Sequence, residues 1–233
     1  MSDPKSSGKR AAARAVADTV PGGARLGLGT GSTVAFFLER LAERVAKERI
    51  EVVGVPTSEA TARRARDLGL RLATLDDLER LDVAVDGAYE VDPRLELIKG
   101  GGAALTREKI VAAAADRFVV IADETKLVPR LGATFRLPIE VLQFGWRQTS
   151  ARIAAAGLPN ELRLDAARRP LRTDNDNFVL DASLGPCDDL RALEREIDAI
   201  PGVLECGLFV GMASEVWIGG ADGRVRTLRR PPA

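Results

Sequence analysis

Apolar residues follow two different patterns along the first half of the chain: short continuous runs and repeats at helical spacing. Short apolar runs predict strands at 25–28, 50–55, 82–85 and 118–122. Apolar residues at helical spacing predict helices at 11–20, 35–48, 58–68 and 75–81, an extended stretch at 70–73 and a helix that ends at 115. Repeated strand–helix units favour an α/β fold with a Rossmann-like parallel sheet and helices on both faces.

The pattern changes after Pro129. Strands and helices are now predicted in the order β-α-β-β-α-β, at 137–142, 149–156, 161–165, 177–181, 188–199 and 203–210. This order resembles a split ferredoxin-like α+β unit. We therefore expect a Rossmann-like domain of residues 1–131 and 206–233, which a strand near 214–218 rejoins, and a smaller ferredoxin-like domain of residues 132–205.

Composition narrows the classes of function. The chain of 233 residues carries 34 Lys and Arg and 34 Asp and Glu without long blocks of one sign, so neither a nucleic-acid nor an anionic-membrane partner is expected. The first ten residues lack the apolar core of a signal peptide, and we expect a cytoplasmic protein. Histidine is absent and the two cysteines lack metal-site spacing, so carboxylates, Lys, Tyr or water must transfer protons, and no metal is expected.

The segment from Lys99 to Lys109 is the strongest candidate for chemistry. Its glycines at 100–102 lack Cβ atoms, so their N–H groups could converge on an oxyanion. Glu108 lies on the helix that follows, on a face formed by small apolar residues, Ala104, Val111, Ala112 and Ala115. Alternatively, the glycines only connect a strand to a helix, and Glu108 pairs with Lys109 or a neighbouring element.

A second glycine-rich stretch, residues 27–33, lies between a predicted strand and a predicted helix. Backbone N–H groups and the positive end of the helix favour phosphate at such a turn. Ser32 stands where a dinucleotide motif needs its third glycine, and the stretch lacks the lysine of a P-loop, so a small phosphate ester fits better than a nucleotide. Helix capping is the alternative role of Ser32 and Thr33.

Four predicted strand ends carry polar residues that could converge on one crevice, because ligands bind at the carboxyl ends of parallel strands. These ends lie at 29–33, 57–58, 86–90 and 123–126. Asp86 could accept or deliver hydroxyl protons there, although Asp-Gly is also a common turn. Lys99 could stabilise developing negative charge as a buried ammonium, and a surface lysine is the alternative.

Six collinear motifs together resemble the type A ribose-5-phosphate isomerase family over nearly the whole chain. They are Gly29-Thr30-Gly31-Ser32-Thr33, Asp86-Gly87-Ala88, Lys99 to Lys109, Ile121-Ala122-Asp123 with Lys126, Thr173-Asp174-Asn175, and Ile200-Pro201-Gly202-Val203. The resemblance implies an isomerase of the non-oxidative pentose phosphate pathway that interconverts D-ribose 5-phosphate and D-ribulose 5-phosphate. It also implies ring opening, a cis-enediolate, no metal or other cofactor, and a homodimer or homotetramer.

The resemblance assigns roles to individual residues. Glu108 matches the catalytic base, and burial on an apolar face is expected to raise its pKa. Lys99 and the N–H groups near Gly100, Gly101 and Gly102 match the groups that stabilise the enediolate oxygen, and Asp86 matches the ring-opening carboxylate. The substrate contacts that it implies are Thr30, Gly31, Ser32, Thr33, Asp86, Gly87, Ala88, Tyr89, Lys99 and Lys126, with Lys9 assisting at the phosphate.

Tyr89 departs from the family pattern Asp-Gly-Ala-Asp-Glu, because it replaces the second aspartate. An uncharged phenol cannot replace a carboxylate as a proton acceptor near neutral pH. We therefore expect reduced turnover or altered substrate preference, unless water or Glu90 takes over the role.

Three other functions compete with this interpretation. A non-catalytic sugar-phosphate-binding module is the main rival, although a placed base such as Glu108 argues for turnover. A related aminosugar-phosphate deaminase would need a catalytic histidine, which the chain lacks. A coenzyme-A transferase shares the layered architecture but not the order of motifs, and fold alone cannot decide.

Overall fold

The computed structural model describes residues 4–230, which form two compact units. Unit 1 contains the described residues up to Ala88, the segment Arg107–Leu127 and the described residues from Met212 onward. Unit 2 contains Tyr89–Thr106 and Val128–Gly211. The chain therefore passes between the units four times, once within the helix that carries Glu108.

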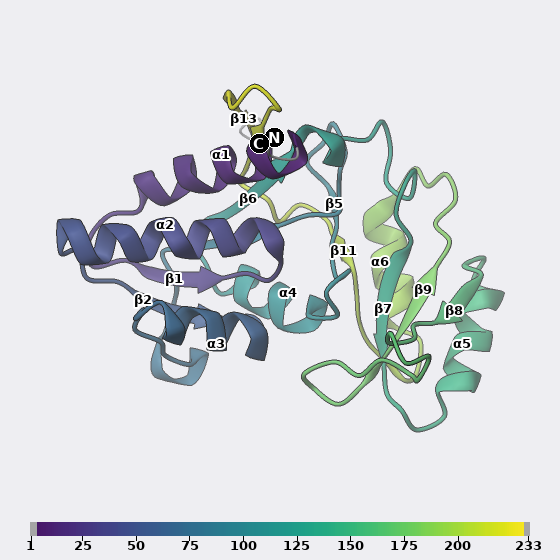
Figure 1. Ribbon diagram of the computed structural model, residues 1–233. Coiled ribbons are helices and arrows are strands. Elements are labelled where there is room, and N and C mark those ends of the chain that lie inside the picture. Colours follow the sequence, from purple (N-terminus) through teal and green to yellow (C-terminus); the bar gives the residue numbers. More distant parts are fainter. Residues whose placement is uncertain (1–3, 231–233) are drawn as a thin grey trace. The chain divides into compact units, whose positions relative to one another are not determined.

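Unit 1 is built on a six-stranded sheet in the order β13-β12-β6-β3-β1-β2 (Figure 1). The strands are β1 (Arg25–Leu28), β2 (Val53–Pro56), β3 (Val83–Gly87), β6 (Phe118–Asp123), β12 (Glu215–Gly219) and β13 (Val225–Arg229). All neighbours are parallel except β12 and β13, which are antiparallel at the edge. The predicted parallel sheet is confirmed, and β12 rejoins it as expected.

Helices cover both faces of this sheet. The main helices of unit 1 are α1 (Pro4–Thr19), α2 (Ser32–Glu48), α3 (Glu59–Asp67) and α4 (Leu105–Ala113), of which α4 begins in unit 2. Leu26 and Leu28 of β1 pack in one core cluster with residues of α1 and α2, including Val16 and Phe37. Gly27 points to the opposite face, where a Cβ would lie 2.5 Å from Val111 of α4.

Unit 2 contains the predicted β-α-β-β-α-β element, which supports the expected smaller α+β unit. Its four-stranded sheet has the order β10-β7-β9-β8, with every neighbouring pair antiparallel. The elements are β7 (Leu137–Val141), α5 (Trp146–Ala155), β8 (Asn160–Leu162), β9 (Phe178–Ala182), α6 (Leu190–Asp198) and β10 (Val203–Cys206). An apolar cluster between this sheet and its helices includes Ile139, Ile153, Leu180 and Ile197.

The observed units differ from the expected domains at residues 89–106, 128–131 and 206–211, all of which group with unit 2. The reason is a small antiparallel sheet in the order β11-β5-β4, formed by β4 (Glu90–Val91), β5 (Leu97–Ile98) and β11 (Leu208–Phe209). Each strand has only two residues, too few to show a periodic pattern. The predicted strand 203–210 is accordingly two strands, β10 and β11.

One further expectation needs correction. The predicted helix 75–81 is a single 3₁₀ turn, η1 (Leu75–Asp77), which Thr74 and Asp77 hold by mutual hydrogen bonds. The predicted extended stretch 70–73 forms a parallel bridge between Leu72 and Gly54 of β2.

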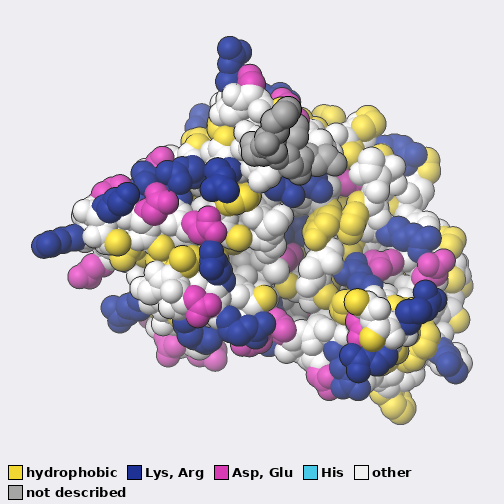
Figure 2. Space-filling model, viewed as in Figure 1, with side chains coloured by type: hydrophobic (Ala, Val, Ile, Leu, Met, Phe, Trp, Pro, Cys, Tyr) yellow, Lys and Arg dark blue, Asp and Glu magenta, His cyan; other side chains and the backbone are white. Residues whose placement is uncertain are grey.

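Lys and Arg side chains alternate with Asp and Glu over the face shown in Figure 2. Within the described part of the chain, no helix combines the length and apolarity that crossing a membrane requires.

The amino ends of β1 and β3 are joined by a charged clamp. Asp82 accepts hydrogen bonds from the backbone N–H of Arg25 at 2.8 Å and from its guanidinium, with Nη2 at 2.6 Å. These bonds, from the Arg25 side chain first and its backbone second, hold the pKa of the Asp82 carboxyl below its ordinary value. The carboxylate therefore stabilises the fold above the ordinary pKa of about 3.9, and this contribution is lost as the pH falls through the lowered value.

We predict that Asp82→Asn lowers the free energy of unfolding by about 1 kcal/mol at pH 7, a small value because the pair is partly exposed. Urea unfolding at pH 7 and at acidic pH would measure it, and the difference from the native protein is expected to vanish at acidic pH. Asp76→Asn, at an exposed position, is the control. If Asp82→Asn lowers the free energy of unfolding by the same amount at both pH values, the ion pair between Arg25 and Asp82 does not stabilise the fold as described.

Candidate active site

The turn after β1 is fixed by the carboxylate of Asp86 at the end of β3. Asp86 is 3% exposed, and its Oδ1 accepts hydrogen bonds from the N–H of Thr30 at 3.0 Å and of Gly87 at 2.7 Å. A Cβ at Gly29 would collide with the Asp86 carboxyl group, so the close approach of this turn requires glycine. The structure thus brings two of the predicted strand ends together.

Hydroxyl groups link this turn to the end of β2. The Oγ1 of Thr30 lies 2.7 Å from that of Thr57 and donates to Ser58 Oγ at 2.8 Å. Thr61 Oγ1 in α3 donates to the carbonyl of Gly29 at 2.8 Å. The hydroxyl of Thr30, predicted to contact the substrate, therefore belongs to an internal network, and Thr61 is a member that sequence reasoning missed.

The start of α2 is open in the way that an anion site needs. Its N-cap is Gly31, with φ 114°, and no side chain caps the helix. Ser32 and Thr33 are the first two helical residues, so neither is the capping residue of the alternative interpretation. Lys9 of α1 donates to Ser32 Oγ at 3.3 Å, which places an ammonium group at the same turn.

Close backbone packing positions Lys9. A Cβ at Gly8 would collide with the carbonyl oxygen of Gly219, the last residue of β12. Gly219 pairs with Asp123 in the register of the parallel strands, so the start of α1 meets the carboxyl edge of the sheet. Lys126 lies at the same edge, in the 3₁₀ turn η2 (Glu124–Lys126) that follows β6.

Glu108 and Asp86 both lie in the layer between the sheet of unit 1 and helix α4. Asp86 follows Ala84 by two residues on β3, and Ala84 and Val111 both lie against Gly27, so Asp86 is on the sheet face that α4 covers. Glu108 precedes Val111 by three residues and shares its side of the helix. It is 4% exposed, as expected for a carboxylate that is not solvated.

The direction of α4 completes this placement. The N–H of Leu81, just before β3, donates to the carbonyl of Ala114, so α4 ends at the amino edge of the sheet. Its start is therefore directed to the carboxyl edge, and Glu108 lies one turn closer to that edge than Val111. Asp86 and Glu108 form a pair of buried carboxylates in one sheet–helix layer.

In unit 2, Lys99 is a buried cation, not the surface lysine of the alternative interpretation. It is 2% exposed, and its Nζ lies 5.3 Å from the ring centroid of Phe209. Its backbone N–H donates to the carbonyl of Gly207 at 2.9 Å. A cation held over an aromatic face and shielded from water acts strongly on nearby negative charge.

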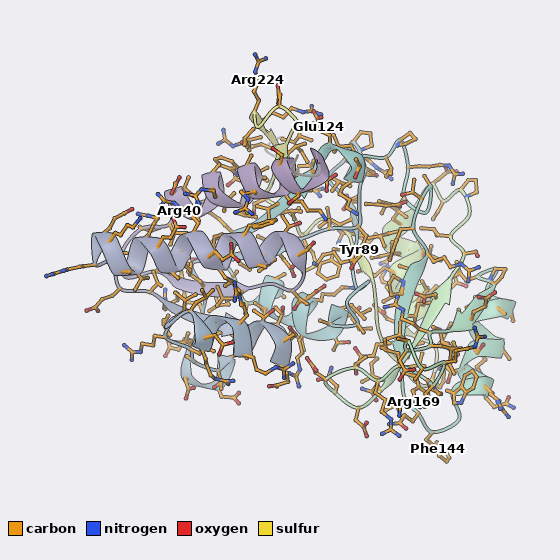
Figure 3. All side chains as sticks on the ribbon, in the orientation of Figure 1. Arg40, Tyr89, Glu124, Phe144, Arg169 and Arg224 are labelled. Atoms are coloured by element: carbon orange, nitrogen blue, oxygen red, sulfur yellow. The ribbon has the colours of Figure 1, made fainter. Side chains whose placement is uncertain are left out.

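Tyr89 covers the middle of the glycine segment. A Cβ at Gly101 would collide with the ring of Tyr89, which is labelled in Figure 3. This ring stacks on Phe135 with centroids 4.3 Å apart. The neighbouring Glu90 is fully buried and accepts hydrogen bonds from the N–H groups of Gly132, Thr134 and Phe135. Tyr89 is therefore held between a fixed loop and the glycines.

Glu140 is a buried carboxylate that the sequence analysis did not identify. It is fully buried on β7 and accepts from Thr106 Oγ1 at 2.5 Å, Thr173 Oγ1 at 2.8 Å, Asn177 Nδ2 at 3.0 Å and Asn175 Nδ2 at 3.2 Å. Thr106 lies in the first turn of α4, between the glycine segment and Glu108. The signal that could have found Glu140 is a charged residue inside an apolar strand, residues 137–141.

A parallel sheet whose carboxyl edge carries an open helix start, a lysine and buried carboxylates is typical of α/β enzymes that act on small phosphate esters. The family model described as ribose 5-phosphate isomerase A (phosphoriboisomerase A) matches residues 53–223. A ribose-5-phosphate isomerase A of Rhodopseudomonas palustris (strain TIE-1) is 53% identical over 228 residues, which cover 95% of this chain and 97% of the relative. The chain belongs to the ribose 5-phosphate isomerase A family.

Solved structures agree with this assignment. A ribose 5-phosphate isomerase A from Methanocaldococcus jannaschii is similar with a TM-score of 0.91 and 40% identity, and the match covers 95% of this chain and 97% of that one. A D-ribose-5-phosphate isomerase in complex with phospho-erythronic acid is similar with a TM-score of 0.92 and 41% identity, at the same coverage.

We predict that Gly101→Ala lowers the free energy of unfolding by about 1–3 kcal/mol, because the new methyl group collides with Tyr89. In a Tyr89→Ala background, Gly101→Ala should lower the free energy of unfolding by clearly less. Urea unfolding of the four proteins of this cycle would measure the coupling. Gly185→Ala, where a Cβ meets nothing within 4 Å, is the control, and an equal cost in both backgrounds would contradict the packing.

Proposed function

We propose that this chain interconverts D-ribose 5-phosphate and D-ribulose 5-phosphate. The observation that carries the proposal is its membership of the isomerase family over nearly its full length, combined with the buried carboxylates Asp86 and Glu108 in one layer. A module that only binds a sugar phosphate has no need to bury a base. The proposal places the reaction in the non-oxidative pentose phosphate pathway.

The phosphate is assigned to the start of α2. The N–H groups at Gly31, Ser32 and Thr33 and the positive helix end attract an anion there. Lys9 supports this assignment because its ammonium reaches Ser32, and Lys126 is assigned to the same phosphate from its place at the carboxyl edge. Backbone and ammonium groups carry this binding, because the hydroxyl of Thr30 serves the internal network.

Proton transfer is assigned to the carboxylates. Asp86 handles the hydroxyl protons as the furanose ring opens, and Gly87 and Ala88 after it line the sugar. Glu108 removes the proton from C2 of the open aldose and returns it to C1. The O2 proton passes to O1, so that the aldehyde oxygen becomes the C1 hydroxyl and C2 becomes the carbonyl carbon. No metal or other cofactor takes part in the proposed reaction.

The cis-enediolate that forms between these steps carries negative charge on oxygen. We assign its stabilisation to the Lys99 ammonium and to the N–H groups of the Gly100–Gly102 segment. One such donor is worth about 3–4 kcal/mol in comparable sites. Burial of Lys99 supports this assignment, because a buried cation interacts with developing charge more strongly than a solvated one.

Assembly and location stay predictions. The resemblance implies a homodimer or homotetramer, and the sequence suggests a cytoplasmic location.

We predict that Glu108→Gln abolishes turnover of ribose 5-phosphate, with a loss of at least about a thousandfold, because the amide cannot accept the C2 proton. A coupled assay of EDTA-treated protein would measure it, beside isothermal titration of phospho-erythronic acid. Binding should survive. Glu59→Gln, an exposed partner of Arg107, is the control. Full activity of Glu108→Gln would refute the assignment, and a native protein that binds the acid without turnover would favour the sugar-phosphate-binding module.

We predict that Tyr89→Asp raises turnover or changes the KM for ribose 5-phosphate, since it restores the family carboxylate and removes the ring from Gly101. Tyr89→Phe keeps the ring and separates its packing from the chemistry of the hydroxyl. Steady-state kinetics with five- and six-carbon sugar phosphates would show both effects. If Tyr89→Asp leaves kcat and KM unchanged, Tyr89 neither limits the turnover rate nor changes the substrate preference.

A further inference from the structure

Arg163 contacts the glycine segment from a distant part of unit 2. It follows β8, and its Nη1 donates to the carbonyl oxygens of Gly100 at 2.9 Å and Gly101 at 3.0 Å. Its side chain is only 12% exposed. None of the six family motifs includes Arg163.

The guanidinium is fixed on its other edge by Asp181 of β9. Arg163 Nε donates to Asp181 Oδ2 at 2.8 Å, and Nη2 donates to Oδ1. The backbone is fixed as well, because the N–H of Arg163 donates to Val179 and its carbonyl accepts from Leu171. Because a planar guanidinium has donors in fixed directions, it can serve the carboxylate and both carbonyls at once.

The direction of the two carbonyls determines the direction of two N–H groups. In a planar trans peptide, the C=O of one residue and the N–H of the next point to opposite sides. Since the carbonyls of Gly100 and Gly101 point to Arg163, the N–H groups of Gly101 and Gly102 point away from it. A charged donor on the carbonyl oxygen also polarises the peptide and strengthens the opposite N–H as a donor.

We propose that Arg163, held by Asp181, is a positioning residue that aims the N–H groups of Gly101 and Gly102 at the developing enediolate oxygen. This inference rests on the proposed isomerase function. Aimed and polarised donors interact more strongly with a full oxyanion than with the neutral oxygens of the bound sugar. Arg163 therefore acts on kcat more than on KM.

The test is Arg163→Lys, which keeps a positive charge beside Asp181 but cannot serve the carboxylate and two carbonyls together. We expect kcat for ribose 5-phosphate to fall about tenfold to a hundredfold, with KM changed less than about threefold. Affinity for phospho-erythronic acid should fall with kcat, because its carboxylate carries the negative charge that the enediolate develops. Affinity for inorganic phosphate should not change. Asp181→Asn, which leaves Arg163 less firmly held, should show a smaller effect of the same kind.

Arg169→Lys is the matched control. Arg169, labelled in Figure 3, donates from Nε and Nη2 to Asp165 in the same unit and is exposed. Native kcat in Arg163→Lys overturns the inference, and so does a fall in thermal stability with unchanged kcat, which marks a structural ion pair alone. If neither the native protein nor Arg169→Lys turns over ribose 5-phosphate, the proposed function itself fails. In that case, equal affinities of the native protein and Arg163→Lys for phospho-erythronic acid would also overturn the inference that Arg163 orients the N–H groups of Gly101 and Gly102.

Discussion

The carboxylate of Asp86 is the group on which the carboxyl edge of unit 1 depends. By accepting the N–H groups of Thr30 and Gly87, it joins the turn after β1 to the end of β3. Burial of a carboxyl group is costly unless hydrogen bonds compensate for it, and these backbone N–H groups supply such bonds. The residue after Thr30, Gly31, is the N-cap of α2 and has a φ of 114°. One buried carboxyl group thus supports both the turn assigned to phosphate and the candidate chemistry.

The sequence predicts unit 1 well because its strands are short apolar runs separated by amphipathic helices. The strand at 25–28 has the same bounds as β1, and the expected order of strand–helix units is present. Prediction fails where periodicity is absent. β4 and β5 have two residues each, and β13 has only two apolar residues, Val225 and Leu228, which do not alternate with its polar ones, so its pattern looks like that of a solvated tail.

The residues of the candidate site also divide into those that a sequence pattern predicts and those that it does not. Residues at the carboxyl ends of parallel strands could be expected to meet, because a single topological rule brings them to one edge. Thr61 and Arg163 could not be found in this way, because they contact segments 32 and 63 residues away through side chains that no local pattern marks. Glu140 is marked only as a charged residue inside an apolar strand, and its contact with Thr106, 34 residues away, has no sequence signal. Arg163 in particular contacts backbone carbonyls, which carry no sequence signal at all.

Unit 2 uses three buried or half-buried charges to fix one short segment. Glu90 fixes the loop that carries Phe135, and Phe135 stacks on the Tyr89 ring over Gly101. Glu140 fixes Thr106 at the end of the segment, and Arg163 fixes its carbonyls. A connecting turn does not require such support, since glycines alone reverse a chain. Donors that must stabilise an oxyanion do require it, because the gain in rate depends on dipoles that are oriented before the charge develops. The rigidity of this segment is therefore what the proposed role of its N–H groups requires.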